Sequence, residues 1–346
     1  MKKLRPAFLL LPAALLLGMG LSAGCSRCDD AATGCMPVLL TDASPSIPQT
    51  AEGEFSVMTF NLYQYLLFDR DRNPATLEPK PQEEVDAVVE AIRRVSPDIL
   101  AVQEIGDPTV WQEFKQSLRQ AGVDYPYDEY LRRPPEDRNL ALLSRHPIIR
   151  RQPHTDDLYT IGPKQFPMRR GILDVEIRIN EAYTVRVMTT HLKSKLFHDY
   201  GQAEMRRNEA RLLCNHVRSA LKENPEVNLI VMGDMNDTPQ SAPIREITTY
   251  QDKAILFDLR PVDFLGDGWT HRGRDDTHER IDYIFVSEHL LPEVVKTKTY
   301  VLNLPSLAKG SDHRPLVATF TAAERDAKKA AKPYEPATPH EFDMDE

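Results

Sequence analysis

Apolar segments with strand character alternate with amphipathic helix patterns along this chain, and that alternation restricts its fold more than any other feature. Residues 55–62 have strand character, and residues 83–95 carry apolar side chains at helical spacing. Residues 98–104 and 110–122 repeat the pair, and Gly122 ends the second helix. Further strands are expected at 139–145, 171–179, 184–192, 227–234, 280–287 and 316–320, and further helices at about 202–222 and 242–248.

The order of these segments predicts an α/β fold. Two successive sets of strands with helices between them favour two sheets packed face to face, with the helices outside. The sequence of 346 residues shows no repeat and no internal linker, so we expect one catalytic domain over residues 55–321. Residues 322–346 are charged and interrupted by prolines, and we expect them to form a disordered tail.

The N-terminus has the features of an export signal, because a basic start precedes an apolar run that ends in small residues. The ending LSAGC also resembles the lipobox of bacterial lipoproteins. We therefore predict a lipoprotein signal peptide over residues 1–24 and an acylated Cys25 that anchors the mature protein in a membrane. Ser26, and not an aspartate, follows Cys25, which favours the outer membrane in a Gram-negative cell envelope. An ordinary secretory signal cut nearby, which would leave a secreted protein, is the alternative.

Residues 25–54 are rich in Ala, Ser, Pro and Thr and lack hydrophobic periodicity, so they are predicted to form a flexible tether. Within the tether, Cys28 and Cys35 could form a small disulfide in an oxidising compartment. Cys214 lies in an amphipathic helix pattern without activating neighbours, and we expect a buried, unreactive thiol.

Polar side chains recur where the predicted strands end. They are Asn61, Glu104, His191, Asp234, Asn236, Asp282, Asp312 and His313. Because strand ends in sheets and sandwiches converge on a shared rim, residues far apart in sequence can form one site there. The pattern therefore predicts a single polar site at one edge of the sheets.

The residue types at these positions suit a hard metal ion and phosphoester chemistry. Mg²⁺ prefers oxygen ligands, which Asn61, Glu104 and Asp312 supply. The sequence contains no HExxH spacing, which argues against a zinc site. It also lacks a G-x-S-x-G elbow and a phosphate-binding P-loop, which argues against a serine hydrolase and an NTPase.

Hydrolysis of a phosphoester by water requires a base, a charge sink and a stabiliser of the leaving oxygen. Asp234 can orient and deprotonate the water, and Asn236 on the same turn can donate a hydrogen bond to the phosphate. Asp282 can hold His313 and raise its pKa, which makes that imidazole a cation for a phosphate oxygen. His191 can polarise the phosphate or assist the leaving group, and Lys193 can add positive charge.

In combination, these motifs resemble those of the endonuclease/exonuclease/phosphatase superfamily. The segments FNL, QE, THLKS, GDMND, RIDYIF and SDHRPL occur between residues 55 and 320 in the family's order. The resemblance implies a four-layered α/β/β/α sandwich of two mixed sheets with a Mg²⁺-dependent site at one end, where Mn²⁺ or Ca²⁺ could substitute. It implies a metal near Asn61 and Glu104, with Asp312 as a metal ligand or a structural carboxylate. It further implies His191 as a phosphate contact or acid, Asp234 as base, Asn236 as transition-state donor and Asp282 as the partner of His313.

Several features favour a monomeric extracytoplasmic nuclease that acts on DNA or RNA. The export signal disfavours a cytoplasmic repair enzyme, and THLKSK is similar to the corresponding motif of secreted bacterial nucleases. The net charge of -9 gives no global attraction for nucleic acid, but local arginines could bind a phosphodiester backbone. These arginines, which equally fit an ordinary mixed-charge surface, are Arg132, Arg133, Arg138, Arg145, Arg169, Arg170, Arg206, Arg207 and Arg211. Of them, Arg169 is our candidate substrate-binding residue, together with Lys193.

Two other functions stay open. The first is a lipid phosphoesterase, similar to a sphingomyelinase or a phosphoinositide phosphatase. RIDYIF replaces the Trp-Cys-Asp-Arg motif of the 5-phosphatases, and Trp111 and Trp269 are too far apart for a membrane-entering aromatic hairpin. The second is a catalytically silent envelope binding protein, which the complete set of motifs disfavours.

Overall fold

Two mixed six-stranded sheets form the centre of the computed structural model, which describes residues 46–73 and 75–325. In order across the first sheet, the strands are β17 (Val294–Val301), β18 (Leu316–Thr321), β1 (Glu54–Tyr65), β2 (Ile99–Ile105), β4 (Asn139–Ser144) and β3 (Tyr127–Leu131). The second sheet contains β13 (Phe257–Asp258), β16 (Asp282–Val286), β10 (Leu229–Asp234), β9 (Tyr183–His191), β8 (Ile172–Asn180) and β5 (Ile148–Arg151). Each sheet has one parallel pair, β1 with β2 and β9 with β10, and its other pairs are antiparallel.

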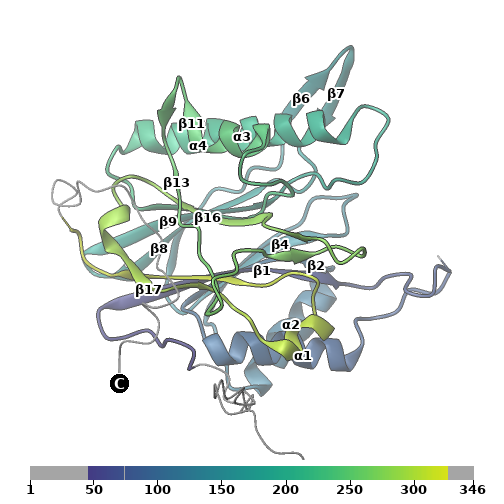
Figure 1. Ribbon diagram of the computed structural model, residues 1–346, viewed down its shortest axis with the longest axis horizontal. Helices are drawn as coiled ribbons and strands as arrows, with labels where there is room; N and C mark the ends of the chain where they lie inside the picture. The colour runs from purple at the N-terminus through teal and green to yellow at the C-terminus, as the bar shows by residue number, and fades with distance from the viewer. Residues whose placement is uncertain (1–45, 74, 326–346) are drawn as a thin grey trace, which may run out of the picture. The chain divides into compact units, whose positions relative to one another are not determined.

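Helices cover the outer faces of both sheets (Figure 1). The helices α1 (Gln82–Val95) and α2 (Pro108–Gln120) lie against the first sheet, and α3 (Gln202–Glu223) and α4 (Ala242–Thr248) lie against the second. The remaining elements are the pairs β6 (Leu158–Ile161) with β7 (Lys164–Pro167), β11 (Thr249–Tyr250) with β12 (Lys253–Ala254), and β14 (His271–Arg272) with β15 (His278–Glu279), and the 3-10 turns η1 (Leu291–Glu293) and η2 (Pro305–Lys309). The four-layered α/β/β/α sandwich predicted from the sequence is confirmed.

Three apolar clusters hold these layers together. Successive side chains along each central strand point to opposite faces and therefore belong to different clusters. In β1, Phe55 and Val57 pack between the sheets, whereas Met58 and Phe60 pack against the first helix layer. The same alternation in β10 places Met232 between the sheets and neighbouring apolar residues under α3 and α4. Because both faces of these strands are buried, their sequences are almost continuously apolar.

The predicted central strands and the four helices are confirmed, but the strands at the edges of the sheets were missed. All four edge strands, β17, β3, β13 and β5, lack a predicted counterpart. β3 has the sequence YDEYL and β17 has VVKTKTYV, and both contain charged residues. Edge strands are half exposed and often carry charges that oppose aggregation, so they lack the apolar pattern of the centre.

The predictions for the chain ends fall mostly outside the described residues. These include the signal peptide, the acylation of Cys25, the pairing of Cys28 with Cys35, and most of the tether and tail. The described end of the predicted tether contacts the domain, since Ile47 packs against the cluster under α1 and α2. At the other end, the backbone N–H of Ala322 donates to Gly53 O at 2.7 Å. None of the helices in the described ranges is long and apolar enough to cross a membrane. Cys214 is buried, as expected, and burial raises the pKa of its thiol.

Candidate active site

Three neighbouring strands of the second sheet bring His191, Asp234 and Asp282 to one rim. Asp234, the last residue of β10, is paired with His191 of β9 on one side and Asp282 of β16 on the other. His191 Nε2 lies 3.3 Å from Asp234 Oδ2, and all three side chains are buried. Residues directly opposite on adjacent strands point to the same face, so register alone aligns this row.

Gly233 allows the close approach of β10 to β9 immediately before Asp234. Its φ is +136°, and a Cβ atom built there would lie 2.1 Å from Thr190 O. No side chain fits that distance, so only glycine can precede Asp234 with this backbone. The glycine in GDMND therefore has a steric role in the placement of the carboxylate.

The first sheet contributes Asn61 of β1, where its pairing with β2 becomes irregular, and Glu104 near the end of β2. Asn61 Nδ2 donates to Asp234 Oδ2 at 3.0 Å and so joins the two sheets. The pairing of β2 shifts register between Gln103 and Ile105, and Glu104 at this bulge has a φ of +62°. Bulges at a rim redirect side chains, and Glu104 Oε2 accepts a hydrogen bond from the backbone N–H of Gln64 at 2.9 Å.

The segment before β18 places His313 over this row. Ser311 Oγ donates to Asn61 O at 2.8 Å and accepts from the backbone N–H of His313 at 3.0 Å, which fixes the segment to β1. The ring atom Nδ1 of His313 lies 2.8 Å from Asp282 Oδ2. Its other nitrogen, Nε2, lies 3.9 Å from Asp234 Oδ2. The predicted pair of Asp282 with His313 is therefore present, with Asp234 on its open side.

Electrostatics give the two histidines opposite protonation states. Burial acts to lower the pKa of His313, but the charge of Asp282 and its hydrogen bond outweigh that effect and raise the pKa to about 10. Burial and the nearby cations Arg170 and His313 hold the pKa of His191 well below its usual value. At neutral pH, His313 is therefore an imidazolium and His191 a neutral ring.

Asp234 is held close to its protonation midpoint at neutral pH. Burial and the charge of Asp282 raise the pKa of Asp234 to about 7, against the lowering effects of His313 and the hydrogen bonds from Asn236 and Asn61. A carboxylate with a pKa near the working pH is an efficient proton acceptor. The turn after it also holds Asn236, whose backbone N–H donates to Asp234 Oδ1 at 2.8 Å. The Asn236 amide donates to Leu192 O at 3.0 Å and keeps a second N–H for another acceptor.

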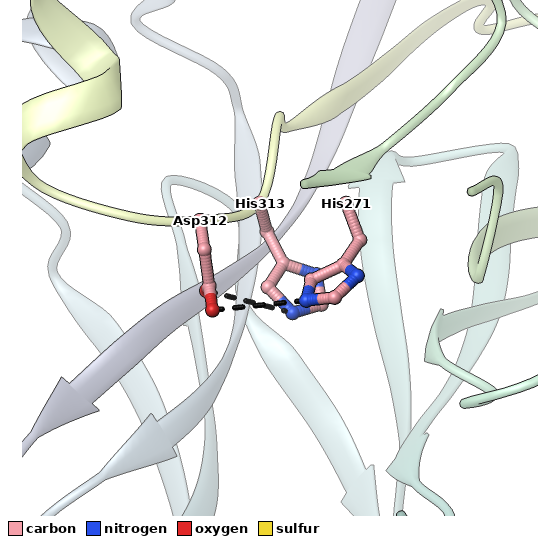
Figure 2. Close-up of side chains that lie close together, drawn as sticks. All are labelled: His271, Asp312 and His313. Atoms are coloured by element: carbon pink, nitrogen blue, oxygen red, sulfur yellow. Dashed lines mark ion pairs between the residues drawn. The ribbon is translucent and has the colours of Figure 1, made fainter. Parts of the chain in front are cut away.

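Asp312 faces two histidine rings, one of which was not predicted (Figure 2). Asp312 Oδ2 lies 3.7 Å from His271 Nε2, and Asp312 Oδ1 lies 3.8 Å from His313 Nε2. His271 belongs to β14, which is tied to the start of β16 because Thr270 Oγ1 accepts from the N–H groups of Ile281 and Asp282, each at 3.0 Å. His271 was not predicted because in the sequence it is a single histidine in GWTHRG, without other ligand residues at a regular spacing.

The donor atoms around Asp312 fit a divalent cation. Among the described residues, Asp312 Oδ1 is buried without a hydrogen-bond partner, and a buried carboxylate oxygen normally has one. In the described part of the chain, two groups of His and Asp side chains have ligand atoms within 4.8 Å of one another, namely His271 with Asp312 and His313, and Asp234 with Asp282 and His313. The imidazolium of His313 has no free lone pair, so Asp312 is the ligand of the first group that is ready to bind a cation. Glu104 belongs to neither group, so it is a neighbour on the rim and not a member of the tight clusters.

The predicted substrate cations already have protein partners. Arg169 Nε and Nη2 donate to Glu136 at 2.8 and 3.0 Å. Lys193 Nζ donates to the carbonyls of Ser194 and Leu196 at 3.0 and 2.9 Å, and burial with the charges of Arg169 and Arg170 lowers its pKa to about 8. Other arginines of the predicted basic surface are paired with carboxylates, namely Arg138, Arg145, Arg206 and Arg207.

A cleft of about 590 Å³ opens beside the site. Asp312 and His313 line it together with residues of the β14–β15 hairpin and of the segment with η2. A volume of this size suits a small molecule or one unit of a polymer.

Known proteins share this fold. A model of the Endonuclease/Exonuclease/phosphatase family matches residues 58–313. No curated protein matches the chain. Among solved structures, the human Nocturnin catalytic domain with bound sulfate anion aligns with a TM-score of 0.58 at 19% identity, over 79% of this chain and 96% of that one. An endonuclease/exonuclease/phosphatase from Beutenbergia cavernae has a TM-score of 0.56 at 20% identity, over 78% of this chain and 72% of that one. ANGEL2, a 2′,3′-cyclic phosphatase, in complex with adenosine-2′,3′-vanadate, has a TM-score of 0.55 at 16% identity, over 77% of this chain and 95% of that one.

Proposed function

Because this chain belongs to the endonuclease/exonuclease/phosphatase family, we propose that it hydrolyses phosphodiester bonds of nucleic acid with the help of a divalent cation, preferably Mg²⁺. The observation that carries this proposal is the Asp282–His313 pair, 2.8 Å apart, beside the buried carboxylate of Asp234. The pair supplies a fixed cation, and Asp234 supplies a base. In-line attack of water on phosphorus needs both.

In the proposed reaction, Asp234 accepts a proton from the attacking water while the water oxygen bonds to phosphorus. Asn61 and His191 hold Asp234 Oδ2, at 3.0 and 3.3 Å, and fix the direction of the carboxylate. The His313 imidazolium and the free N–H of Asn236 donate to phosphate oxygens as their charge grows. The bond from phosphorus to the leaving oxygen then breaks, and that oxygen keeps the electron pair and takes a proton from solvent.

The residues that would hold the cation are Asp312, with its unpartnered oxygen, and Glu104 and Asn61 on the neighbouring strand ends. A bound divalent cation would neutralise charge on the phosphate and on the leaving oxygen. Oxygen ligands favour Mg²⁺, and the closeness of His271 to Asp312 favours acceptance of Mn²⁺ as well.

Two observations support nucleic acid as the substrate class. The segment THLKSK is similar to that of secreted bacterial nucleases. In addition, ANGEL2, one of the proteins with this fold, has an adenosine-2′,3′-vanadate complex, so the fold can accommodate a nucleoside next to a phosphorus-like centre.

An exposed apolar segment favours a second candidate, a lipid phosphoesterase. Leu196 and Phe197 follow Lys193 and are 76% and 83% exposed. Large apolar side chains at that exposure beside a site are suited to contact with a lipid surface. The predicted lipid anchor at Cys25 would keep the protein near such a surface.

A substrate panel tests the proposal. The mature protein is incubated with DNA, RNA, sphingomyelin vesicles, phosphoinositide vesicles and bis(p-nitrophenyl) phosphate, with Mg²⁺ or with EDTA. We expect Mg²⁺-dependent cleavage of DNA or RNA. Cleavage of a lipid without either nucleic acid would establish the second candidate, and no cleavage of any substrate would exclude phosphodiester hydrolysis.

We also propose that the protein is exported and anchored in the cell envelope through Cys25. Mass spectrometry of the purified N-terminus tests this directly. A diacylglyceryl-modified Cys25 is expected, and an unmodified N-terminus cut near residue 24 would indicate secretion without an anchor.

A further inference from the structure

We propose that the cleft between the β14–β15 hairpin and η2 binds a second phosphate of the substrate, through Arg274 and Lys309. The inference rests on the proposed phosphodiesterase function and gives that site a direction: the nucleic acid strand extends from the scissile phosphate into this cleft.

The cleft begins at the catalytic residues. Its volume is about 590 Å³, and Asp312 and His313 belong to its lining. Arg274 lies on the hairpin side and Lys309 ends η2 on the other side. A phosphate bound between them would therefore belong to the same substrate molecule as a phosphate held by His313.

Most charged residues of the lining have a partner of opposite charge in the described part of the chain, but Arg274 and Lys309 do not. Arg272 Nη2 lies 2.6 Å from Asp276 Oδ1, Arg314 Nη1 lies 2.7 Å from Asp263 Oδ2, and Glu84 Oε2 lies 2.9 Å from Lys80 Nζ. Arg274 and Lys309 are exposed and, within residues 46–73 and 75–325, have neither an ion pair nor a hydrogen bond from their side chains. Asp312 is the carboxylate assigned to the cation. The cleft thus keeps two uncompensated positive charges.

Binding a phosphate at three other arginines around the site would require an existing ion pair to break. Arg138 is bound to Asp137 at 2.8 Å, Arg169 to Glu136 at 2.8 Å and Arg206 to Asp237 at 2.8 Å. Arg274 and Lys309 lose no protein partner when a phosphate binds. Arginine offers a planar fork of donors and lysine a point charge, and both bind phosphate oxygens well.

The ligand class that fits is a phosphodiester strand with at least two phosphates, one at His313 and the next in the cleft. The other lining residues support a polymer unit between them, because Pro305, Leu307 and Ala308 present apolar surface on the η2 side. A chain with a net charge of -9 gains its attraction for nucleic acid from such local cations.

The test compares two substrates that differ by one nucleotide: a dinucleoside monophosphate and the corresponding trinucleoside diphosphate, which has a second phosphate. For the double variant Arg274→Ala/Lys309→Ala, we expect kcat/KM for the longer substrate to fall about tenfold at low salt. The slope of log(kcat/KM) against log salt concentration should decrease by the amount expected for about two ionic contacts. The kcat/KM for the shorter substrate should change less than about twofold, because basal chemistry uses neither residue. A matched control, Arg119→Ala/Lys253→Ala, removes the same charge from exposed positions outside the cleft and should leave both values unchanged.

Three results would overturn the inference: an unchanged preference for the longer substrate, an equal loss on both substrates, or an equal loss in the control variant. If the wild type cleaves neither substrate, the proposed function fails, and equilibrium binding of the trinucleoside diphosphate then decides the inference separately. The same affinity in the wild type and the cleft variant would contradict it, whereas weaker binding only in the cleft variant would support it. A phosphoinositide carrying two phosphates, bound in place of the nucleotide and lost in the cleft variant, would also overturn the assignment to nucleic acid.

Discussion

His313 and Asp282 form a buried pair in which Nδ1 of the ring lies 2.8 Å from a carboxylate oxygen. Asp282 begins β16 of the second sheet, and His313 lies in the segment that leads into β18 of the first sheet. This pair keeps a positive charge in the lining of the cleft and determines how the activity should respond to substitution and to pH.

The first prediction concerns Asp282→Asn. The amide keeps the size of the side chain but removes the negative charge that raises the pKa of His313 against the effect of burial, so this pKa should fall from about 10. At pH 7.5 we expect kcat to fall about 100-fold or more. The loss should be smaller at pH 5.5, where His313 is protonated again. Equal loss at both pH values, in a variant with an unchanged melting temperature, would show that Asp282 does not act through the charge of His313.

The second prediction concerns the base. Because Asp234 has a pKa raised to about 7, it accepts protons only as pH rises through that value. The rate should therefore increase with pH, with a midpoint at or below about pH 7, since a bound cation can only lower the value. Asp234→Asn should reduce kcat by about 100-fold or more and remove this limb of the pH profile. Persistence of the limb in the variant would assign it to another group.

Metal binding gives a third prediction. Asp312→Asn should increase the Mg²⁺ concentration needed for half-maximal activity by at least about tenfold, because it removes the charge of a carboxylate whose Oδ1 is buried without a hydrogen-bond partner among the described residues. His271→Ala should leave the Mg²⁺ requirement nearly unchanged and weaken Mn²⁺ binding, since imidazole suits the softer ion. Isothermal titration with each metal, on the protein without substrate, measures both effects. Unchanged affinity for both ions in Asp312→Asn would remove this residue from the metal site.

Gly233 provides a test of the scaffold. In Gly233→Ala, the new methyl group meets Thr190 O at 2.1 Å, so β9 and β10 must separate. We expect a loss of about 2–4 kcal/mol in the free energy of unfolding, together with a loss of activity because Asp234 is displaced. Chemical denaturation and initial rates measure the two effects. Gly122→Ala, at a turn with no atom within 4 Å of the new Cβ, is the control and should retain activity.

A stability prediction comes from a group outside the site. Burial is the main cause that raises the pKa of Glu293 from 4.5 to about 7, and Tyr183 donates a hydrogen bond to its carboxylate. The folded state therefore binds more protons than the unfolded state between these values, so stability falls as pH rises from about 4.5 through 7. The free energy of unfolding of the wild type should fall by about 1–3 kcal/mol between pH 4.5 and 8, and Glu293→Gln should reduce this fall. Urea titrations at a series of pH values measure it. An unchanged slope would mean that another group causes it.

The centre of the fold and most of the site were predictable because both follow local rules. Central strands are buried on both faces and so give apolar runs, and each run ends where a polar residue begins. The register of β9, β10 and β16 then aligns His191, Asp234 and Asp282 without further information. The sequence patterns also pointed to Asn61 and His313, although Asn61 lies within β1 and His313 precedes β18.

What escaped prediction depends on long-range pairing. His271 joins the site because the hairpin β14–β15 folds over it, and a lone histidine has no periodicity that reports this. The arginines predicted as a basic surface are mostly bound to carboxylates far away in sequence, such as Glu136 for Arg169. Arg274 and Lys309 became significant only because their neighbours are paired and they are not.

The central claim is that Asp234 and the Asp282–His313 pair drive metal-dependent phosphodiester hydrolysis. It is tested most directly by the initial rate of hydrolysis of a short DNA duplex and of bis(p-nitrophenyl) phosphate, measured for the wild type, Asp234→Asn and Asp282→Asn across a Mg²⁺ titration. We predict that the wild type hydrolyses at least one of the two only with a divalent cation, that EDTA stops the reaction and added Mg²⁺ restores it, and that both variants lose about 100-fold or more while remaining folded. Hydrolysis at the wild-type rate in either variant, or none by the wild type at any cation concentration, would contradict the account.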